Sequence, residues 1–167
     1  IQGEAGVIVP DDNYWQKVSA LCKKHNILLA FDEVQTGFGR TGANFAHQLY
    51  NIKPDITTLG KIIGGGLPLA AVGGSTEIMQ QLAPTGPVYQ AGTLSGNPIA
   101  MSAGLAMLTY LNEHKEVYIS LEKKTSYLRQ GIEKVLNDSS IAYQINSIGS
   151  MISVHFTNTP VVDFNSA

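Results

Sequence analysis

The feature that most constrains the fold is an apolar run, residues 27–31 (ILLAF), which follows a segment with helical periodicity. Tyr14, Val18 and Leu21 recur at helical spacing ahead of it. A run that is apolar throughout predicts a strand buried on both faces, as is typical of parallel sheets. A helix leading into such a strand favours the α/β class, in which strands and helices alternate.

The same alternation continues along the chain. We expect further strands at residues 7–10, 56–59 and 69–72, and long helices at residues 99–112 and 116–137. The tail alternates as strands do, at residues 142–145 and 151–156, which predicts the start of a smaller α+β domain. We therefore predict an α/β doubly wound sheet with flanking helices, and a domain boundary between residues 113 and 114.

Composition and charge exclude several kinds of partner. The net charge is −2 and no basic run occurs, so neither nucleic acid nor an anionic membrane surface is an expected partner. No apolar stretch reaches about 18 residues, so we predict no membrane span. The four histidines lack metal-ligand spacing, and no metal site is predicted. The chain begins at Ile1 rather than Met, and we expect it to be a piece of a longer protein.

Two charged residues follow predicted strands. Asp32 comes directly after residues 27–31, and Lys61 follows residues 56–59 after one glycine. Ligands of α/β sheets gather at the carboxyl ends of the strands. A carboxylate that ends an apolar strand is expected to be partly buried and to need a cationic partner. A lysine beside three glycines can lose solvation and act as an amine nucleophile. Taken singly, Asp32 also fits a turn cap and Lys61 a solvated loop lysine.

Together these two residues indicate a cofactor. Enzymes that use pyridoxal 5'-phosphate (PLP) need a lysine to hold the cofactor's aldehyde and a carboxylate to keep its ring nitrogen protonated. The separation of roughly thirty residues is about one strand–helix–strand step. Residues 92–98 (GTLSGNP) offer hydroxyl and N–H groups just ahead of a helix, a suitable place for a phosphate.

Two segments carry a family resemblance. Residues 31–38 (FDEVQTGF) and 54–61 (PDITTLGK) resemble the signature of class III aminotransferases. Residues 57–74 and 86–98 are similar almost residue for residue to the glutamate-1-semialdehyde aminomutases of that family, and residues 150–167 resemble them too. The resemblance covers nearly the whole chain. It implies a fold-type-I PLP enzyme, with residues 1–113 as the second half of the large domain. Residues 114–167 would form a connecting helix and the beginning of the small domain.

The resemblance also implies residue roles. Lys61 would hold PLP covalently and shuttle protons, and Asp32 would bind the ring nitrogen. Val34 would pack against one face of the ring, and Gln35 would lie near the ring hydroxyl. Thr93, next to Gly92, would reach the phosphate of the neighbouring subunit's PLP, which implies a homodimer with shared active sites.

Other segments favour a different branch of the family. Residues 1–6 and 39–42 look like ornithine and acetylornithine aminotransferases, and aminomutases usually carry Asn in place of Glu4 and Met in place of Gln35. Glu4 would then pair with a substrate-binding arginine, unless it is a plain solvated carboxylate.

Three functions remain open at this stage. The favoured one is isomerisation of glutamate-1-semialdehyde, a small molecule, to 5-aminolevulinate, a tetrapyrrole (porphyrin) precursor. We expect this reaction in the cytoplasm, or in the plastid stroma of a plant. The alternatives are an ω-aminotransferase that uses 2-oxoglutarate, and an inactive fragment with a structural or assembly role.

Overall fold

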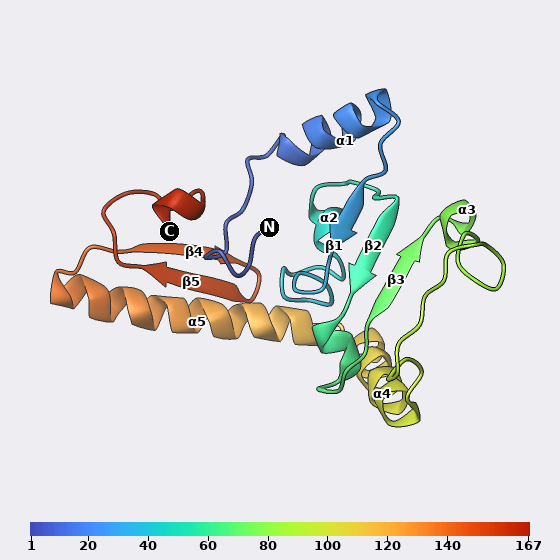
Figure 1. Ribbon diagram of the computed structural model, residues 1–167. Helices are drawn as coiled ribbons and strands as arrows, with labels where there is room; N and C mark the ends of the chain where they lie inside the picture. Colours follow the sequence, from blue (N-terminus) through green and yellow to red (C-terminus); the bar gives the residue numbers. More distant parts are fainter.

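The chain folds around two separate sheets, and the computed structural model describes all of residues 1–167. The first sheet has the order β1-β2-β3 and is formed by β1 (Ala30–Asp32), β2 (Ile56–Leu59) and β3 (Ala71–Gly74). The second is an antiparallel hairpin of β4 (Gln144–Ile148) and β5 (Met151–His155). Figure 1 shows the hairpin lying along the long helix α5 (Glu116–Ser139), so that the two sheets belong to separate lobes.

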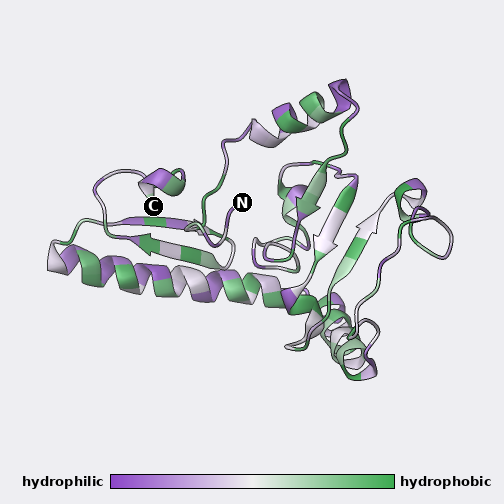
Figure 2. Ribbon diagram, viewed as in Figure 1, coloured by the Kyte–Doolittle hydropathy of each residue, from purple (hydrophilic) through white to green (hydrophobic).

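The remaining helices lie around the first sheet, except for the last one, which lies beside the β4–β5 hairpin (Figure 1). They are α1 (Tyr14–Lys24), α2 (Ala46–Leu49), α3 (Thr76–Met79) and α4 (Pro98–Glu113), with short 3-10 helices at Lys61–Gly64 and Phe164–Ser166. The two long helices predicted from the sequence are confirmed as α4 and α5. Figure 2 shows hydrophilic and hydrophobic residues interleaved along α5, as expected of a helix that packs on one side only. None of the helices has the length and apolarity needed to cross a membrane.

The register of the first sheet sets where its strands end. β1 and β2 are parallel, with Ala30 opposite Ile56 and Asp32 opposite Thr58, which confirms the predicted parallel pairing. β3 runs antiparallel to β2. The backbone N–H of Glu33 donates to the carbonyl of Thr58 at 2.9 Å, which extends the pairing past the end of β1. The carboxyl ends of β1 and β2 therefore lie at the same edge of the sheet.

Burial of the apolar run differs from the prediction. Phe31 is buried and contacts the ring of Trp15 from α1, with ring centroids 4.6 Å apart. Leu29 is also buried, but Ile27 and Leu28 are 58% and 59% exposed, so the prediction of burial on both faces is wrong for this chain. The reason is that other residues of this chain pack against only one face of β1.

Residues 1–8 form a turn, and the strand predicted at residues 7–10 is absent. Gln2 and Ile8 form a single antiparallel bridge, and Val7 has a φ of 54°, which no strand residue adopts. This turn packs on the hairpin, since the side-chain amide of Asn146 donates to the carbonyl of Gly6 at 3.1 Å. The amino-terminal segment thus lies beside the second sheet and connects the two lobes (Figure 1).

Candidate active site

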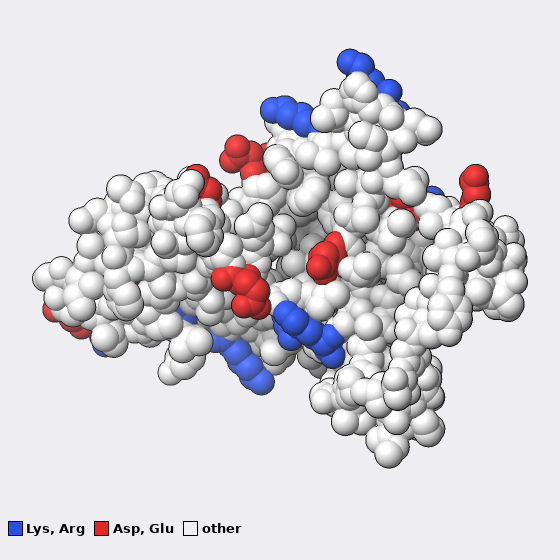
Figure 3. Space-filling model, viewed as in Figure 1, with Lys and Arg blue, Asp and Glu red and all other residues white.

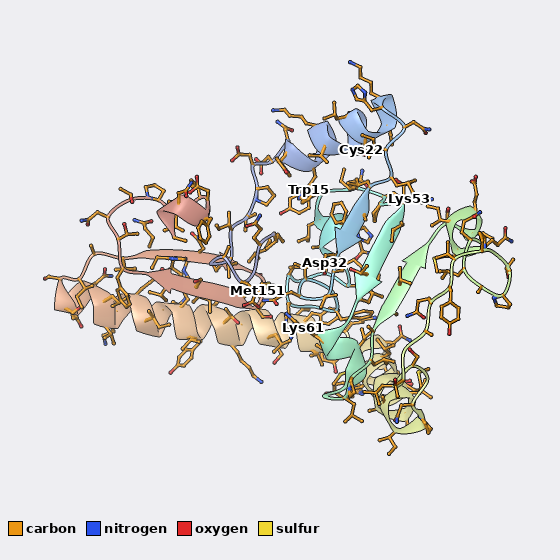
Figure 4. The ribbon with its side chains drawn as sticks, viewed as in Figure 1. Trp15, Cys22, Asp32, Lys53, Lys61 and Met151 are labelled. Carbon is orange, nitrogen blue, oxygen red and sulfur yellow. The ribbon has the colours of Figure 1, made fainter.

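The ends of β1 and β2 open into one cavity. Its volume is about 360 Å³, and its lining includes Asp32, Val34, Gln35, Lys61 and the segment Ile1–Ala5. Figure 4 shows Asp32 at the end of β1 and Lys61 just beyond the end of β2. Charged side chains are sparse on the face drawn in Figure 3, where both signs occur around the hollow between the lobes. The structure therefore brings together five residues to which the sequence assigned roles, the fifth being Glu4.

Lys61 has an unusual backbone conformation. It begins the 3-10 helix Lys61–Gly64 with a φ of 50°, in the left-handed region. For a residue with a Cβ atom this conformation costs about 1–2 kcal/mol. Such strain concentrates at functional sites, where the surrounding structure imposes it. A Cβ atom at the preceding Gly60 would lie 3.3 Å from Cγ1 of Val34, so the glycine permits close approach of the two segments.

The Lys61 amine is held by two other segments of the chain. Its Nζ donates to the side-chain oxygen of Gln35 and lies 3.8 Å from Oε1 of Glu4. Gln35 is fixed in turn, because Nη1 of Arg40 donates to its backbone carbonyl at 3.1 Å. The Lys61 side chain stays 45% exposed, so the loss of solvation expected from the sequence is incomplete in this chain.

Asp32 is exposed, which corrects the expectation of a partly buried carboxylate. Its Oδ1 accepts a hydrogen bond from the backbone N–H of Val34 at 2.9 Å, while its Oδ2 accepts none from the chain. No basic side chain of this chain pairs with Asp32, and the carboxylate borders the cavity. A carboxylate with a free oxygen and an amine on the same cavity fit a ligand with a protonated ring nitrogen and an aldehyde.

Gly92 and Thr93 line a second cavity of about 1000 Å³, which they share with parts of β2 and β3. Val34 lines both cavities and is the point of contact between them. The backbone N–H groups of Thr93, Leu94 and Gly96 donate to no other group of the chain. This loop therefore offers unpaired donors together with the Thr93 hydroxyl.

The first turn of α4 has no N–H group left to bind a ligand. Oδ1 of Asn97 accepts from the N–H groups of Ile99 and Ala100 at 3.0 and 3.2 Å. Pro98 has no N–H group. A phosphate would therefore be bound by the loop before the helix, not by the helix terminus.

The buried carboxylate at this sheet edge is Glu33, a residue that sequence reasoning missed. It is 1% exposed and has the most deeply buried side chain of the chain. The signal was available, because residues two apart on a strand share a face and Phe31 was already expected in the core. A carboxylate on the buried face, however, is rare unless it has partners that the sequence does not identify.

The second lobe contacts the loop that follows Glu33. The N–H of Ser150, in the β4–β5 turn, donates to the carbonyl of Arg40 at 2.8 Å. From α5, the hydroxyl of Tyr118 donates to Oδ1 of Asn44 at 2.9 Å. Burial raises the pKa of the Tyr118 phenol, which keeps this donor protonated. The loop of residues 36–44 is thus held from both lobes.

Comparisons with known proteins agree with this geometry. The family model for class-III aminotransferases matches residues 1–165. A glutamate-1-semialdehyde 2,1-aminomutase of Flavobacterium psychrophilum is 52% identical over all 167 residues, and the chain spans 39% of its length. An ornithine aminotransferase structure from Plasmodium yoelii has a TM-score of 0.79 and 40% identity, covering 95% of this chain and 42% of that one.

The β-phenylalanine aminotransferase structure from Variovorax paradoxus has a TM-score of 0.87 and 31% identity, covering 99% of this chain and 38% of that one. These neighbours confirm the α/β fold predicted from the sequence, and the family match confirms the resemblance of the two signature segments. The chain belongs to the class-III aminotransferases, a family of PLP-dependent enzymes.

Proposed function

We propose that this chain forms the part of a PLP enzyme that carries the cofactor lysine, and that the whole protein converts glutamate-1-semialdehyde to 5-aminolevulinate. The observation that carries the proposal is the shared cavity of Lys61 and Asp32 at adjacent parallel strand ends. The substrate assignment is supported by relatives named glutamate-1-semialdehyde 2,1-aminomutase at 50–52% identity.

The residues of the cavity fit PLP at three points of the cofactor. Lys61 would hold the aldehyde carbon through Nζ, and Asp32 would accept from the ring N–H through its free Oδ2. Val34 would pack on a ring face, since it lies beside Asp32 on the cavity wall. PLP, when bound, supplies an aldehyde for the substrate's amino group and a ring that accepts electron density from the adjacent carbon.

The chain's own residues would then carry out the proton transfers. Once released from its covalent role, the Lys61 amine would shuttle protons between the substrate carbon and the cofactor's aldehyde carbon. Gln35 would orient that amine, because its side-chain oxygen accepts a hydrogen bond from Nζ. The carboxylate of Asp32 would keep the ring nitrogen protonated throughout. The reaction is an isomerisation, in which an amino group moves between neighbouring carbons and no second substrate is consumed.

We also propose a homodimer with shared sites. The unpaired N–H groups near Thr93 and its hydroxyl would bind the phosphate of the partner subunit's PLP, with Gly92 giving close backbone approach. A dimer is supported by the uncovered apolar side chains that follow this loop, since Ile99 and Leu105 of α4 are both 70% exposed. Residues 1–113 would form the second half of the large domain and residues 114–167 the start of the small domain, in a protein of the cytoplasm or plastid stroma.

An ω-aminotransferase is the second candidate. Two observations favour it: the ornithine aminotransferase neighbour, and the placement of Glu4 and Gln35 at the Lys61 amine. In that case the amino group would be transferred to 2-oxoglutarate. Glu4 would then contact the substrate or an arginine that binds the substrate.

The two candidates are separated by one assay of the whole protein. Glutamate-1-semialdehyde is supplied without any 2-oxo acid, and 5-aminolevulinate is measured. In a parallel reaction, ornithine and 2-oxoglutarate are supplied, and glutamate is measured. Formation of 5-aminolevulinate without an acceptor supports the aminomutase. Turnover only in the second reaction would overturn it in favour of the aminotransferase.

A further inference from the structure

We infer that Glu33 is a positioning residue, whose buried carboxylate fixes the strand end that presents Asp32 and Val34 to the cavity. The inference rests on the proposed function of those two neighbours. It assigns Glu33 no contact with substrate or cofactor. Its role follows from three features: burial, saturation with hydrogen bonds, and its place directly after β1.

The Glu33 carboxylate is saturated with donors. Oε2 accepts from the N–H of Ala46 at 3.0 Å and from the hydroxyl of Thr36. Oε1 accepts from the N–H of His47 at 2.9 Å and lies 3.1 Å from Nδ1 of the same histidine. Hydrogen bonds to an ionised acceptor are roughly twice as strong as neutral ones, and a low-dielectric interior strengthens them further.

The side chain and backbone of Glu33 join the end of β1 to helix α2 and to strand β2. Ala46 and His47 open the short helix α2, so the carboxylate caps that helix from thirteen residues away. The backbone of Glu33 is fixed as well: its N–H bonds to the carbonyl of Thr58 on β2, and its carbonyl accepts from Gly37 N–H at 2.9 Å. Side chain and both backbone groups of Glu33 are therefore all bound.

A residue held in this way determines the direction of its neighbours. Asp32 and Val34 both line the cavity, whereas the side chain of Glu33 between them points into the interior. The hydrogen bond from Val34 N–H to Asp32 Oδ1 needs the same backbone conformation. Any rotation at Glu33 would turn the proposed partner of the ring nitrogen away from its place.

The substitution Glu33→Gln removes the negative charge of the side chain without changing its shape. The new amide NH₂ is a donor and would face another donor, either the N–H of Ala46 or the N–H of His47. One buried hydrogen bond would be lost and a donor left unsatisfied, so the segment would have to move. The matched control is Glu116→Gln. Glu116 also pairs with a histidine, at 3.0 Å from Nδ1 of His114, but this pair is solvent-exposed.

The experiment measures equilibrium PLP binding and the absorption spectrum of bound PLP in the whole protein, together with the melting temperature of the PLP-free form. We expect Glu33→Gln to weaken PLP binding about tenfold or more, as loss of a charged hydrogen bond predicts, and to alter the spectrum. Glu116→Gln should leave both unchanged. A merely structural Glu33 would lower only the melting temperature, and that result would overturn the inference.

A second pair of variants keeps the test decisive if Glu33→Gln does not fold. Thr36→Val removes the hydroxyl that donates to Glu33, and Thr36→Ser restores it. The valine variant should bind PLP more weakly, and the serine variant should regain most of the loss. Equal affinity of valine and serine variants would count against the inference. If the parent protein binds no PLP, the proposed function fails first and the inference fails with it.

Discussion

Replacing Gly149 with alanine should break the contact between the β4–β5 turn and the loop beside the active site. Gly149 has a φ of 55°, which costs an alanine about 1–2 kcal/mol. The new Cβ atom would lie 2.5 Å from the carbonyl carbon of Thr41 and 2.6 Å from Arg40 O and Gly42 N. These are backbone atoms that cannot yield alone, and overpacking of this kind costs about 1–3 kcal/mol. The expected loss of stability is about 2–5 kcal/mol.

The assay is thermal unfolding of the PLP-free whole protein, in which we expect Gly149→Ala to melt several degrees below the parent. Gly131→Ala is the matched control, because a Cβ atom there meets nothing within 4 Å on helix α5. Alanine is favoured over glycine inside a helix by about 0.5–1 kcal/mol, so the control should melt at or above the parent temperature. Equal melting temperatures for Gly149→Ala and the parent would refute the packing of the turn on this loop.

Three further predictions concern the proposed PLP site in the whole protein. After borohydride reduction, peptide mapping should find the pyridoxyl mass on Lys61, and finding it on Lys53 would exclude the assignment. Asp32→Asn should lower kcat about a hundredfold, equivalent to a few kcal/mol of transition-state stabilisation, while PLP still binds; unchanged turnover would make Asp32 merely structural. A mixed dimer of Thr93→Ala and Lys61→Ala subunits should recover turnover at one site if sites are shared, whereas no recovery would show that each subunit is self-contained.

Much of this could be predicted from the sequence because the deciding signals are local. Helices α4 and α5 follow from periodicity. The first strand end follows from an apolar run that stops at Asp32, and the second from a short run that stops at Gly60, just before Lys61. Once β1 and β2 are parallel, their carboxyl ends must meet at one edge, so the two residues come together without further information. The roles assigned to them stay predictions until tested.

Only the tertiary structure decided which carboxylate is buried and which donors are free. Asp32 and Glu33 are adjacent and chemically alike, but the N–H groups that bind the Glu33 carboxylate belong to Ala46 and His47, thirteen and fourteen residues along the chain. The side chain of Asn97 likewise binds the N–H groups at the start of α4, so the free donors lie in the loop before the helix. Burial and hydrogen-bond saturation depend on segments that meet only after folding, whereas strands and helices depend on residues a few positions apart.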